Sequence, residues 1–291
     1  MKKLICISIT AVIVSILAYQ SLAIVDANKG KVNLGSSDIF KQYADSVVVI
    51  FTEDEHSKPF GQGSGFLVNS NGVIITNYHV IAGSSSALVK LKDGRKIKAE
   101  GIVAISKEKD LAIIKIPSQG LKYAAMGDSD DLEPGDAVVA IGAPIGLEYS
   151  ISDGMVSSIR TLDDVKNGIK MIQTSAPLSP GSSGCPLFNM RGEVIGVCVM
   201  SIKAGQNLNF AIPINYAKPM ISNRITMSFK EISKDKSLVS KEDKEKVFIT
   251  KTGKKYHRAG CRWLSKSKSI RSITRGEAER NGFTPCKTCK P

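Results

Sequence analysis

Short apolar segments separated by turn signals dominate the chain between Ala44 and Pro213. Each runs for about four to eight residues with alternating or continuous apolar character, which is typical of a β-strand. The dipeptides between them include Asn-Gly, Asp-Gly, Pro-Gly and Arg-Gly, which favour turns. Such closely spaced strands predict an antiparallel barrel or sandwich and argue against a βαβ fold. Two sets, at about residues 44–125 and 135–213, would suit two barrels, with a terminal helix over residues 214–227.

The beginning of the chain differs from this pattern. Two lysines precede an apolar run from Leu4 to Ala18, and small residues follow up to Ala23. This order predicts a secretory signal peptide. An uncleaved membrane anchor is the alternative, because the run approaches the ~18 residues that a short span needs. In both cases we expect the folded part to be exported, in the periplasm or outside the cell.

The positive charge is concentrated at the other end of the chain. Residues 246–291 hold thirteen Lys or Arg against two acidic residues, Glu277 and Glu279, and so carry +11 of the net charge of +13. An anionic partner, either nucleic acid or a cell-envelope polymer, would fit this segment. The alternative is a basic module that is merely soluble.

Composition along the chain predicts five segments. The 291 residues are 42% hydrophobic, enough for a folded core, but the stretch before the basic end is polar and charged. We therefore expect the following order: 1–23 signal peptide or N-terminal anchor, 24–40 linker, 41–225 strand-rich domain, 226–245 charged linker, and 246–291 small C-terminal module.

Three separated motifs contain the residue types of a hydrolase triad. His79 ends the apolar segment GVIITNYHV, Asp110 directly precedes the apolar segment LAIIKI, and SPGSSGCPLFN supplies serines among glycines. Alone, the histidine is more often structural, and the serine-rich loop more often a simple connection. Together they follow the order His, Asp, Ser, which is one of the known triad orders. An imidazole activates the hydroxyl, a carboxylate orients the imidazole, and glycines let backbone N–H groups face an oxyanion.

The segments GSGFLVNSNGVIITNYHVI, KDLAIIKI, SPGSSGCPLFN and LNFAIPI resemble, in order and spacing, the trypsin-like proteases of the HtrA/Deg group. The resemblance covers about residues 40–225. It implies an all-β, chymotrypsin/trypsin-like double β-barrel that cleaves unfolded or damaged polypeptides in protein quality control, without a catalytic cofactor. Oligomers are compatible with it, although no PDZ-like domain is recognisable.

The same resemblance implies the role of each site residue. His79 would be the general base, Asp110 its orienting acid and Ser183 the nucleophile. The backbone N–H groups of Gly181 and Ser183 would form the oxyanion hole. A substrate pocket would involve three apolar residues, Leu178, Leu208 and Phe210.

Three positions depart from the family pattern: Ser182 replaces Asn, Ser175 replaces Asp, and Cys185 replaces Gly. If position 185 requires a positive φ, a Cβ there costs about 1 kcal/mol. Otherwise Cys185 is a small buried residue, or it forms a disulfide with Cys198 across a predicted hairpin. These departures leave an alternative function open, a weakly active or inactive protease-fold binding protein targeted by the basic module.

The C-terminal module contains His257-x3-Cys261 and, after 24 intervening residues, Cys286-x2-Cys289. One imidazole and three thiolates can close a tetrahedral zinc site, and a segment this short needs such stabilisation. The alternative is a redox pair or disulfide between the last two cysteines. With Tyr256, Trp263 and the ending GFTPC, the module resembles the Ada-like Cys/His zinc modules of exported bacterial proteins. This resemblance implies a structural, closed zinc site.

Overall fold

The computed structural model describes the protein in segments: residues 33–143, 149–161, 168–199, 209–233, 246–250, 253–265, 267, 269–275, 278 and 283–289. The signal peptide or anchor expected over residues 1–23 lies outside the described residues. Among the described helices, none is long and apolar enough to cross a membrane.

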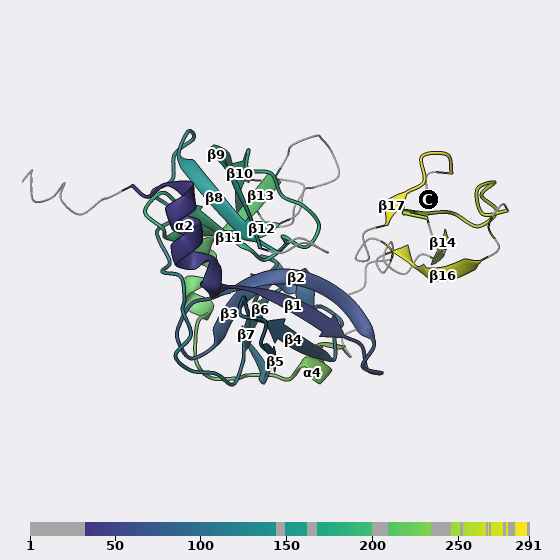
Figure 1. Cartoon of the computed structure of the whole chain (residues 1–291), viewed down its shortest axis with the longest axis horizontal. Coiled ribbons are helices and arrows are strands. Elements are labelled where there is room, and N and C mark those ends of the chain that lie inside the picture. The colour runs from purple at the N-terminus through teal and green to yellow at the C-terminus, as the bar shows by residue number, and fades with distance from the viewer. Residues whose placement is uncertain are drawn as a thin grey trace, which may run out of the picture.

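The first half of the main domain is a seven-stranded antiparallel sheet with the order β5-β4-β1-β2-β3-β7-β6 (Figure 1). Its strands β3 and β7 pair with each other and are buried at nine of their ten positions. This burial explains why both are continuous apolar runs in the sequence. The strands are β1 Val47–Glu53, β2 Pro59–Leu67, β3 Val73–Asn77, β4 Ser86–Lys90, β5 Lys96–Lys98, β6 Gly101–Ser106 and β7 Leu111–Lys115.

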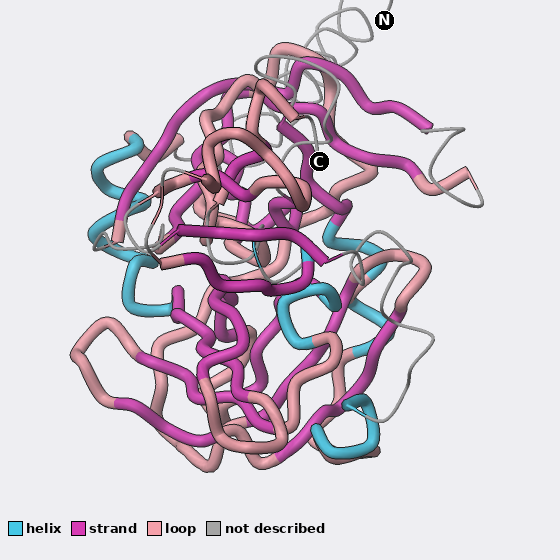
Figure 2. The backbone as a smooth tube through the Cα atoms, turned by 90° about the vertical axis from the view of Figure 1, so that its right-hand side faces the viewer, coloured by secondary structure: helices cyan, strands magenta, loops and turns pink. Residues whose placement is uncertain are grey.

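The second half is a closed six-stranded barrel with the order β10-β13-β12-β11-β8-β9. Strands β11 and β12 form the predicted hairpin, whose turn is closed by the hydrogen bond from Gly192 N to Asn189 O. The all-β prediction of two barrel-like halves is confirmed, with the first half an open curved sheet (Figure 2). The barrel strands are β8 Ala137–Gly142, β9 Ser150–Thr161, β10 Lys170–Thr174, β11 Pro186–Asn189, β12 Val194–Val199 and β13 Asn209–Pro213.

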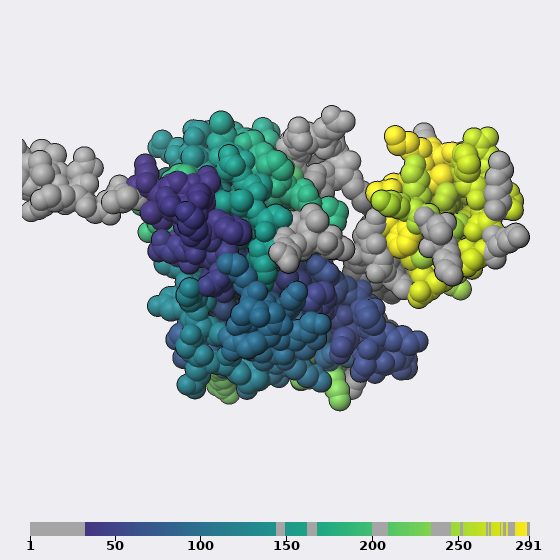
Figure 3. All heavy atoms as spheres, in the orientation of Figure 1, coloured from purple at the N-terminus to yellow at the C-terminus, as the bar shows by residue number. Residues whose placement is uncertain are grey.

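The two halves share one hydrophobic core. Phe66 and Ile75 from the sheet pack in the same buried cluster as Phe188 and Val194 from the barrel. The space-filling view accordingly shows the two halves in direct contact (Figure 3). A loop that lies on this boundary can therefore be held by contacts with both halves.

Two helices extend the packed chain into the segments expected to be linkers. Helix α2, Ser36–Tyr43, buries Ile39 and stacks Tyr43 on Phe188 with 5.3 Å between ring centroids. Helix α4, Phe229–Ser233, buries Phe229 and Ile232 in the core of the seven-stranded sheet.

The terminal helix expected over residues 214–227 is not formed. The segment contains only two 3₁₀ turns, η2 Ile214–Tyr216 and η3 Lys218–Met220, and then runs extended along β6. Pro219 lacks the N–H that a continuing helix needs. The backbone beyond it bonds to Ile102 instead, which accepts from Thr226 N and donates to Met227 O, both at 2.9 Å.

The C-terminal residues form two small sheets of two strands. Strand β14, Lys246–Thr250, pairs antiparallel with β16, Ile270–Thr274, and β15, Lys255–Tyr256, pairs parallel with β17, Thr284–Pro285. The fully or nearly buried apolar residues at their centre are few: Val247, Tyr256, Ile273 and Ala278.

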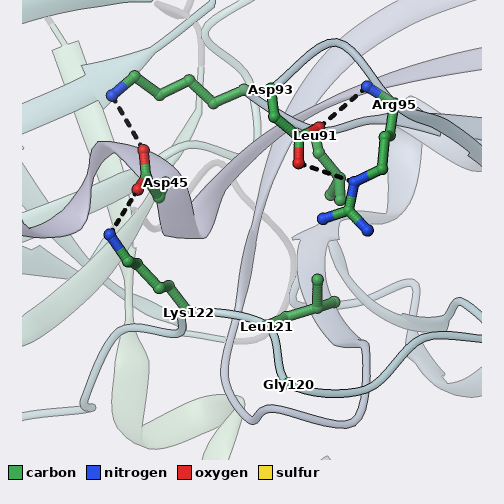
Figure 4. A pocket seen from close by; sticks show the side chains of 8 residues that line it. Asp45, Leu91, Asp93, Arg95, Gly120, Leu121 and Lys122 are labelled. Atoms are coloured by element: carbon green, nitrogen blue, oxygen red, sulfur yellow. Dashed lines mark hydrogen bonds and ion pairs between the residues drawn. The ribbon is translucent and has the colours of Figure 1, made fainter.

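A carboxylate clamp fastens the N-terminal part of the domain to the seven-stranded sheet. Asp45, in the turn η1 Ala44–Ser46, accepts from Lys92 Nζ at 3.0 Å and from Lys122 Nζ at 2.7 Å (Figure 4). The clamp borders a cavity of about 430 Å³. Hydrogen bonds from Lys122 and Lys92 lower the pKa of Asp45 below its usual 3.8.

We expect Asp45→Asn to lower the free energy of unfolding at pH 7 by up to about 1 kcal/mol, because the pairs are partly exposed. A lowered pKa in the folded state means that the stabilisation is complete above the usual carboxyl pKa and is lost as pH falls. Urea titrations should therefore show a difference in the free energy of unfolding from wild type at pH 7, and this difference should shrink as pH falls below about 3.8. Asp131→Asn removes an exposed carboxylate without an ion pair in the described chain, and should change neither value. A difference that stays constant as pH falls would contradict the clamp.

Candidate active site and metal centre

His79 and Asp110 are joined by two hydrogen bonds. His79 Nδ1 lies 2.7 Å from Asp110 Oδ2, and the backbone N–H of His79 donates to Asp110 Oδ1 at 2.8 Å. The two residues meet because His79 follows β3, within helix α3 Tyr78–Ile81, and Asp110 precedes the paired strand β7. A neutral imidazole that donates through Nδ1 has its lone pair on Nε2, where it can accept a proton.

An unusual backbone conformation aims the Asp110 carboxylate. Asp110 has a φ of 50°, a left-handed value that non-glycine residues rarely adopt. Its carbonyl oxygen accepts from the backbone N–H of Tyr78 and from Asn77 Nδ2, each at 3.1 Å. These two hydrogen bonds hold the strained turn, so Asn77 belongs to the site although no motif in the sequence singles it out.

Ser183 lies on the loop between β10 and β11, and this loop is docked on strand β2. Ser64 donates its backbone N–H to Ser183 O at 2.8 Å, and its hydroxyl to Gly181 O at 2.7 Å. Gly184 has a φ of 87°, and a Cβ there would lie 2.2 Å from Ser64 O. Only glycine allows this approach.

Gly63 of β2 lies between the histidine and the serine segments. A Cβ on Gly63 would lie 2.6 Å from a methyl of Val80, the residue after His79, and 3.3 Å from Ser183 O. The structure thus brings the three predicted residues to one region at the boundary of the two halves. Ser183 makes no hydrogen bond to His79 within the described chain. This contact is often long without substrate and tightens on binding.

The backbone N–H groups around Ser183 fall into two sets. Those of Ser182, Gly184 and Cys185 each donate to a backbone carbonyl at 2.9 Å. Those of Gly181 and Ser183 have no acceptor among the described residues. An oxyanion hole requires backbone N–H donors of this kind, which lie beside the predicted nucleophile and are not used by another acceptor of the described chain.

The residues expected for the substrate pocket are only partly placed. Leu178 is half-buried against the barrel core, and Phe210 in β13 is 5% exposed. Asn209 Nδ2 donates to Ala176 O at 2.9 Å, which ties β13 to the segment before Ser183. Leu208 lies outside the described residues.

The departures from the family pattern fit the structure. Cys185 is fully buried and has no positive φ, since the non-glycine residues with positive φ in the described chain are Ser57 and Asp110. Ser175 Oγ accepts the Met155 N–H at 3.0 Å, so the missing carboxylate leaves no unpaired group there.

Cys185 and Cys198 face each other as free, buried thiols. A hydrogen bond with Cys185, together with burial, raises the pKa of Cys198. A buried thiol with a raised pKa, such as that of Cys198, reacts slowly with oxidants, because the thiolate is the reactive form.

The structure also brings together the four predicted metal ligands of the C-terminal module. The ligand atoms of His257, Cys261, Cys286 and Cys289 all lie within 4.8 Å of one another, and the first three residues are buried. His257 Nδ1 is 3.3 Å from Cys261 Sγ. The backbone N–H of Arg258 donates to Cys289 Sγ at 3.3 Å, so the protein already stabilises negative charge on that sulfur.

Two members of the cluster, His257 and Cys286, have pKa values shifted toward the forms that bind metal. Burial, followed by the charge of Lys255, lowers the pKa of His257. Burial alone would raise the pKa of Cys286, but the N–H groups of Cys289 and Thr288 and the neighbouring thiols lower it to about 7. Burial raises the pKa of Cys289, so the Cys286 thiolate forms before the Cys289 thiolate. Neutral imidazole and thiolate are the metal-binding forms.

Comparison with known proteins shows similarity to trypsin-like serine proteases. Residues 63–197 match the trypsin-like peptidase domain. The chain is 39% identical over 170 residues to the putative serine protease HhoB of Synechocystis sp., covering 57% of this chain and 41% of that protein. It is 44% identical over 160 residues to a probable periplasmic serine endoprotease DegP-like of Halomonas elongata, covering 53% of this chain and 33% of the relative. The chain therefore spans less than half the length of these relatives.

Solved structures of an HtrA-type protease are also similar to this chain. The HtrA-type protease AlgW with tripeptide superposes with a TM-score of 0.59 at 31% identity, covering 64% of this chain and 62% of that one. The same protease with decapeptide gives a TM-score of 0.57 at 28% identity, covering 64% of this chain and 66% of that one. These similarities support the fold and the recognition made from the sequence.

We expect Cys185→Gly to destabilise the protein. Cys185 is fully buried in the barrel core without a positive φ, so glycine leaves a cavity and adds backbone freedom. The free energy of unfolding in urea should fall by about 2 kcal/mol, and Cys185→Ala should lose less. Higher stability in the glycine variant would show that the cysteine is strained at this position.

Proposed function

We propose that this chain, which carries a trypsin-like peptidase domain and has HtrA/DegP-like serine proteases among its homologues, is an exported serine endopeptidase with Ser183 as its nucleophile. The observation that carries the proposal is the His79–Asp110 pair, placed beside a loop whose Gly181 and Ser183 N–H groups have no acceptor in the described chain. No other arrangement of His, Asp and Ser among the described residues has these features together.

In this mechanism His79 Nε2 removes the proton from Ser183 Oγ as the oxygen attacks the peptide carbonyl. Asp110 holds the Nδ1 proton and stabilises the imidazolium that results. The developing oxyanion binds the N–H groups of Gly181 and Ser183. His79 then delivers its proton to the leaving amine, and water hydrolyses the ester left on Ser183 by the same steps.

We infer unfolded or damaged polypeptides as the substrate class and the periplasm as the location. The location rests on relatives that are named as periplasmic serine endoproteases. The substrate class rests on the resemblance of the sequence motifs to the HtrA/Deg proteases. Leu178 and Phe210 would line the pocket for an apolar side chain. The named relatives give no support for a nucleic-acid or envelope-polymer partner.

The alternative of an inactive binding protein has less support. It rested on Cys185 and Ser175, and both fit their positions without strain or an unpaired group. The expected catalytic residues are all present as well.

We expect purified residues 24–291 to hydrolyse fluorescently labelled casein, and Ser183→Ala to abolish this activity. Asp110→Asn should lower kcat by at least ~10³-fold, because the imidazole loses its orientation and its charge partner. Labelling with a fluorophosphonate reports the activated hydroxyl directly and should disappear in Ser183→Ala. Ser46→Ala, which removes a buried hydroxyl remote in sequence from the triad, is the control. A folded wild type that is neither labelled nor active would overturn the proposal.

We further propose that the four-residue Cys/His cluster holds a structural zinc ion. Tetrahedral zinc bound at about 2.3 Å to sulfur and about 2.0–2.1 Å to nitrogen places ligand atoms about 3.5–4 Å apart. The 3.3 Å between His257 Nδ1 and Cys261 Sγ is close to that spacing. Four protein ligands would leave no open position, so the ion would fold the module and take no part in proteolysis.

We expect the zinc content to be about one per chain by mass spectrometry and to fall to nearly zero in Cys286→Ser. Trp263, the one tryptophan of the chain, reports on the module alone. A chelator should shift its fluorescence as the module unfolds, while casein hydrolysis continues. Cys198→Ser is the matched control and should keep its zinc. Unchanged fluorescence in a metal-free protein would contradict a structural ion.

A further inference from the structure

Ser64 is the residue of the seven-stranded sheet that contacts the Ser183 loop through both its backbone and its side chain. Its N–H donates to Ser183 O at 2.8 Å, and its hydroxyl donates to Gly181 O at 2.7 Å. The same hydroxyl oxygen accepts the N–H of Ala143, at the end of the barrel strand β8, at 3.3 Å. The Ser64 carbonyl accepts from Thr76 Oγ1 at 2.7 Å.

The surroundings of Ser64 leave no room for other partners. Ser64 and Thr76 are both fully buried. Gly184 approaches the Ser64 carbonyl so closely that no Cβ fits between them. If the Ser64 hydroxyl were removed, Gly181 O would lose its partner in a dry environment, which costs free energy unless the peptide rotates.

We propose that Ser64 is a positioning residue that holds the oxyanion loop in its active geometry. The inference rests on the proposed function, since it assigns the Gly181 and Ser183 N–H groups to the oxyanion hole. Ser64 fixes the carbonyls of both residues, and the peptide that carries the Ser183 N–H lies between these two fixed points. That peptide therefore cannot turn its N–H away from a bound oxyanion.

The Ser64 contacts cross the boundary between the two halves. Ser64 belongs to β2 of the sheet, whereas Gly181, Ser183 and Ala143 belong to the barrel half. His79 and Asp110 are carried by the sheet. Ser64 thus aligns the oxyanion N–H donors of the barrel half with the general base, His79, of the sheet half. The same transition state needs both the donors and the base.

The test compares Ser64→Ala with Ser46→Ala in the full exported chain. Ser46 is equally buried and also donates its hydroxyl to a backbone carbonyl, Tyr43 O at 2.6 Å, but within its own turn. Loss of an oxyanion donor costs ~10²–10³-fold in kcat. Because Ser64 acts through the loop, we expect Ser64→Ala to lower kcat on labelled casein by about 10–100-fold. KM should stay nearly unchanged, and fluorophosphonate labelling should slow in parallel with kcat.

Thermal unfolding of the two variants distinguishes a positioning role of Ser64 from a simple loss of protein stability. The inference is supported if both lose similar stability and only Ser64→Ala loses kcat and labelling rate. It is overturned if Ser64→Ala keeps the kcat of Ser46→Ala, or if KM rises with kcat unchanged. Should Ser64→Ala fail to fold, Ser64→Cys keeps the volume and a weak donor. A reduced labelling rate in that folded variant supports the inference, and a wild-type rate overturns it.

The controls distinguish this inference from the proposed function. A wild type that resists labelling overturns the proposed function and the inference with it. A labelled wild type with an equally labelled Ser64→Ala overturns the inference alone.

Discussion

The contact between strand β2 and the Ser183 loop is the constraint on which the candidate site depends. A Cβ on Gly184 would lie 2.2 Å from the Ser64 carbonyl oxygen, and a Cβ on Gly63 would lie 3.3 Å from the Ser183 carbonyl oxygen. The backbone of one half therefore touches the backbone of the other, which side-chain packing alone does not achieve. Because backbone hydrogen bonds have narrow geometry, this contact fixes the serine loop more tightly than an apolar interface would. The small residues of the segment Gly63–Gly65 follow from this requirement.

Much of this arrangement could be predicted from the sequence. The apolar runs of β3 and β7 mark buried strands, and the residues at their ends, His79 and Asp110, meet because those strands pair. The strand pattern and the turn signals also predicted the hairpin of β11 and β12. Each of these features depends only on the local apolar periodicity of the sequence and on the pairing of two strands.

Other features depend on contacts between distant residues and could not be read from the sequence. The left-handed φ of Asp110 is held by Asn77, and the Gly181 carbonyl is held by Ser64, 117 residues away. A helix was expected after β13, over residues 214–227. Pairing with Ile102 of β6 competes for the same backbone groups and prevails. Helix α2 was hidden in an expected linker because a single turn of apolar residues, centred on Ile39, is too short a signal.

The two parts of the chain meet the requirement for a stable core by different means. The main domain buries large clusters of branched and aromatic residues, one of them shared between its halves, and no metal is needed to explain its stability. The C-terminal module buries only Val247, Tyr256, Ile273 and Ala278 in its central cluster, too few to offset the entropy of ordering its loops. Its ligand cluster joins β15 to the residues after β17, which are the elements with the least backbone pairing. A metal bound there would supply cross-links where the sheets supply least, and this complementarity explains why the ligands lie at the ends of the shortest strands.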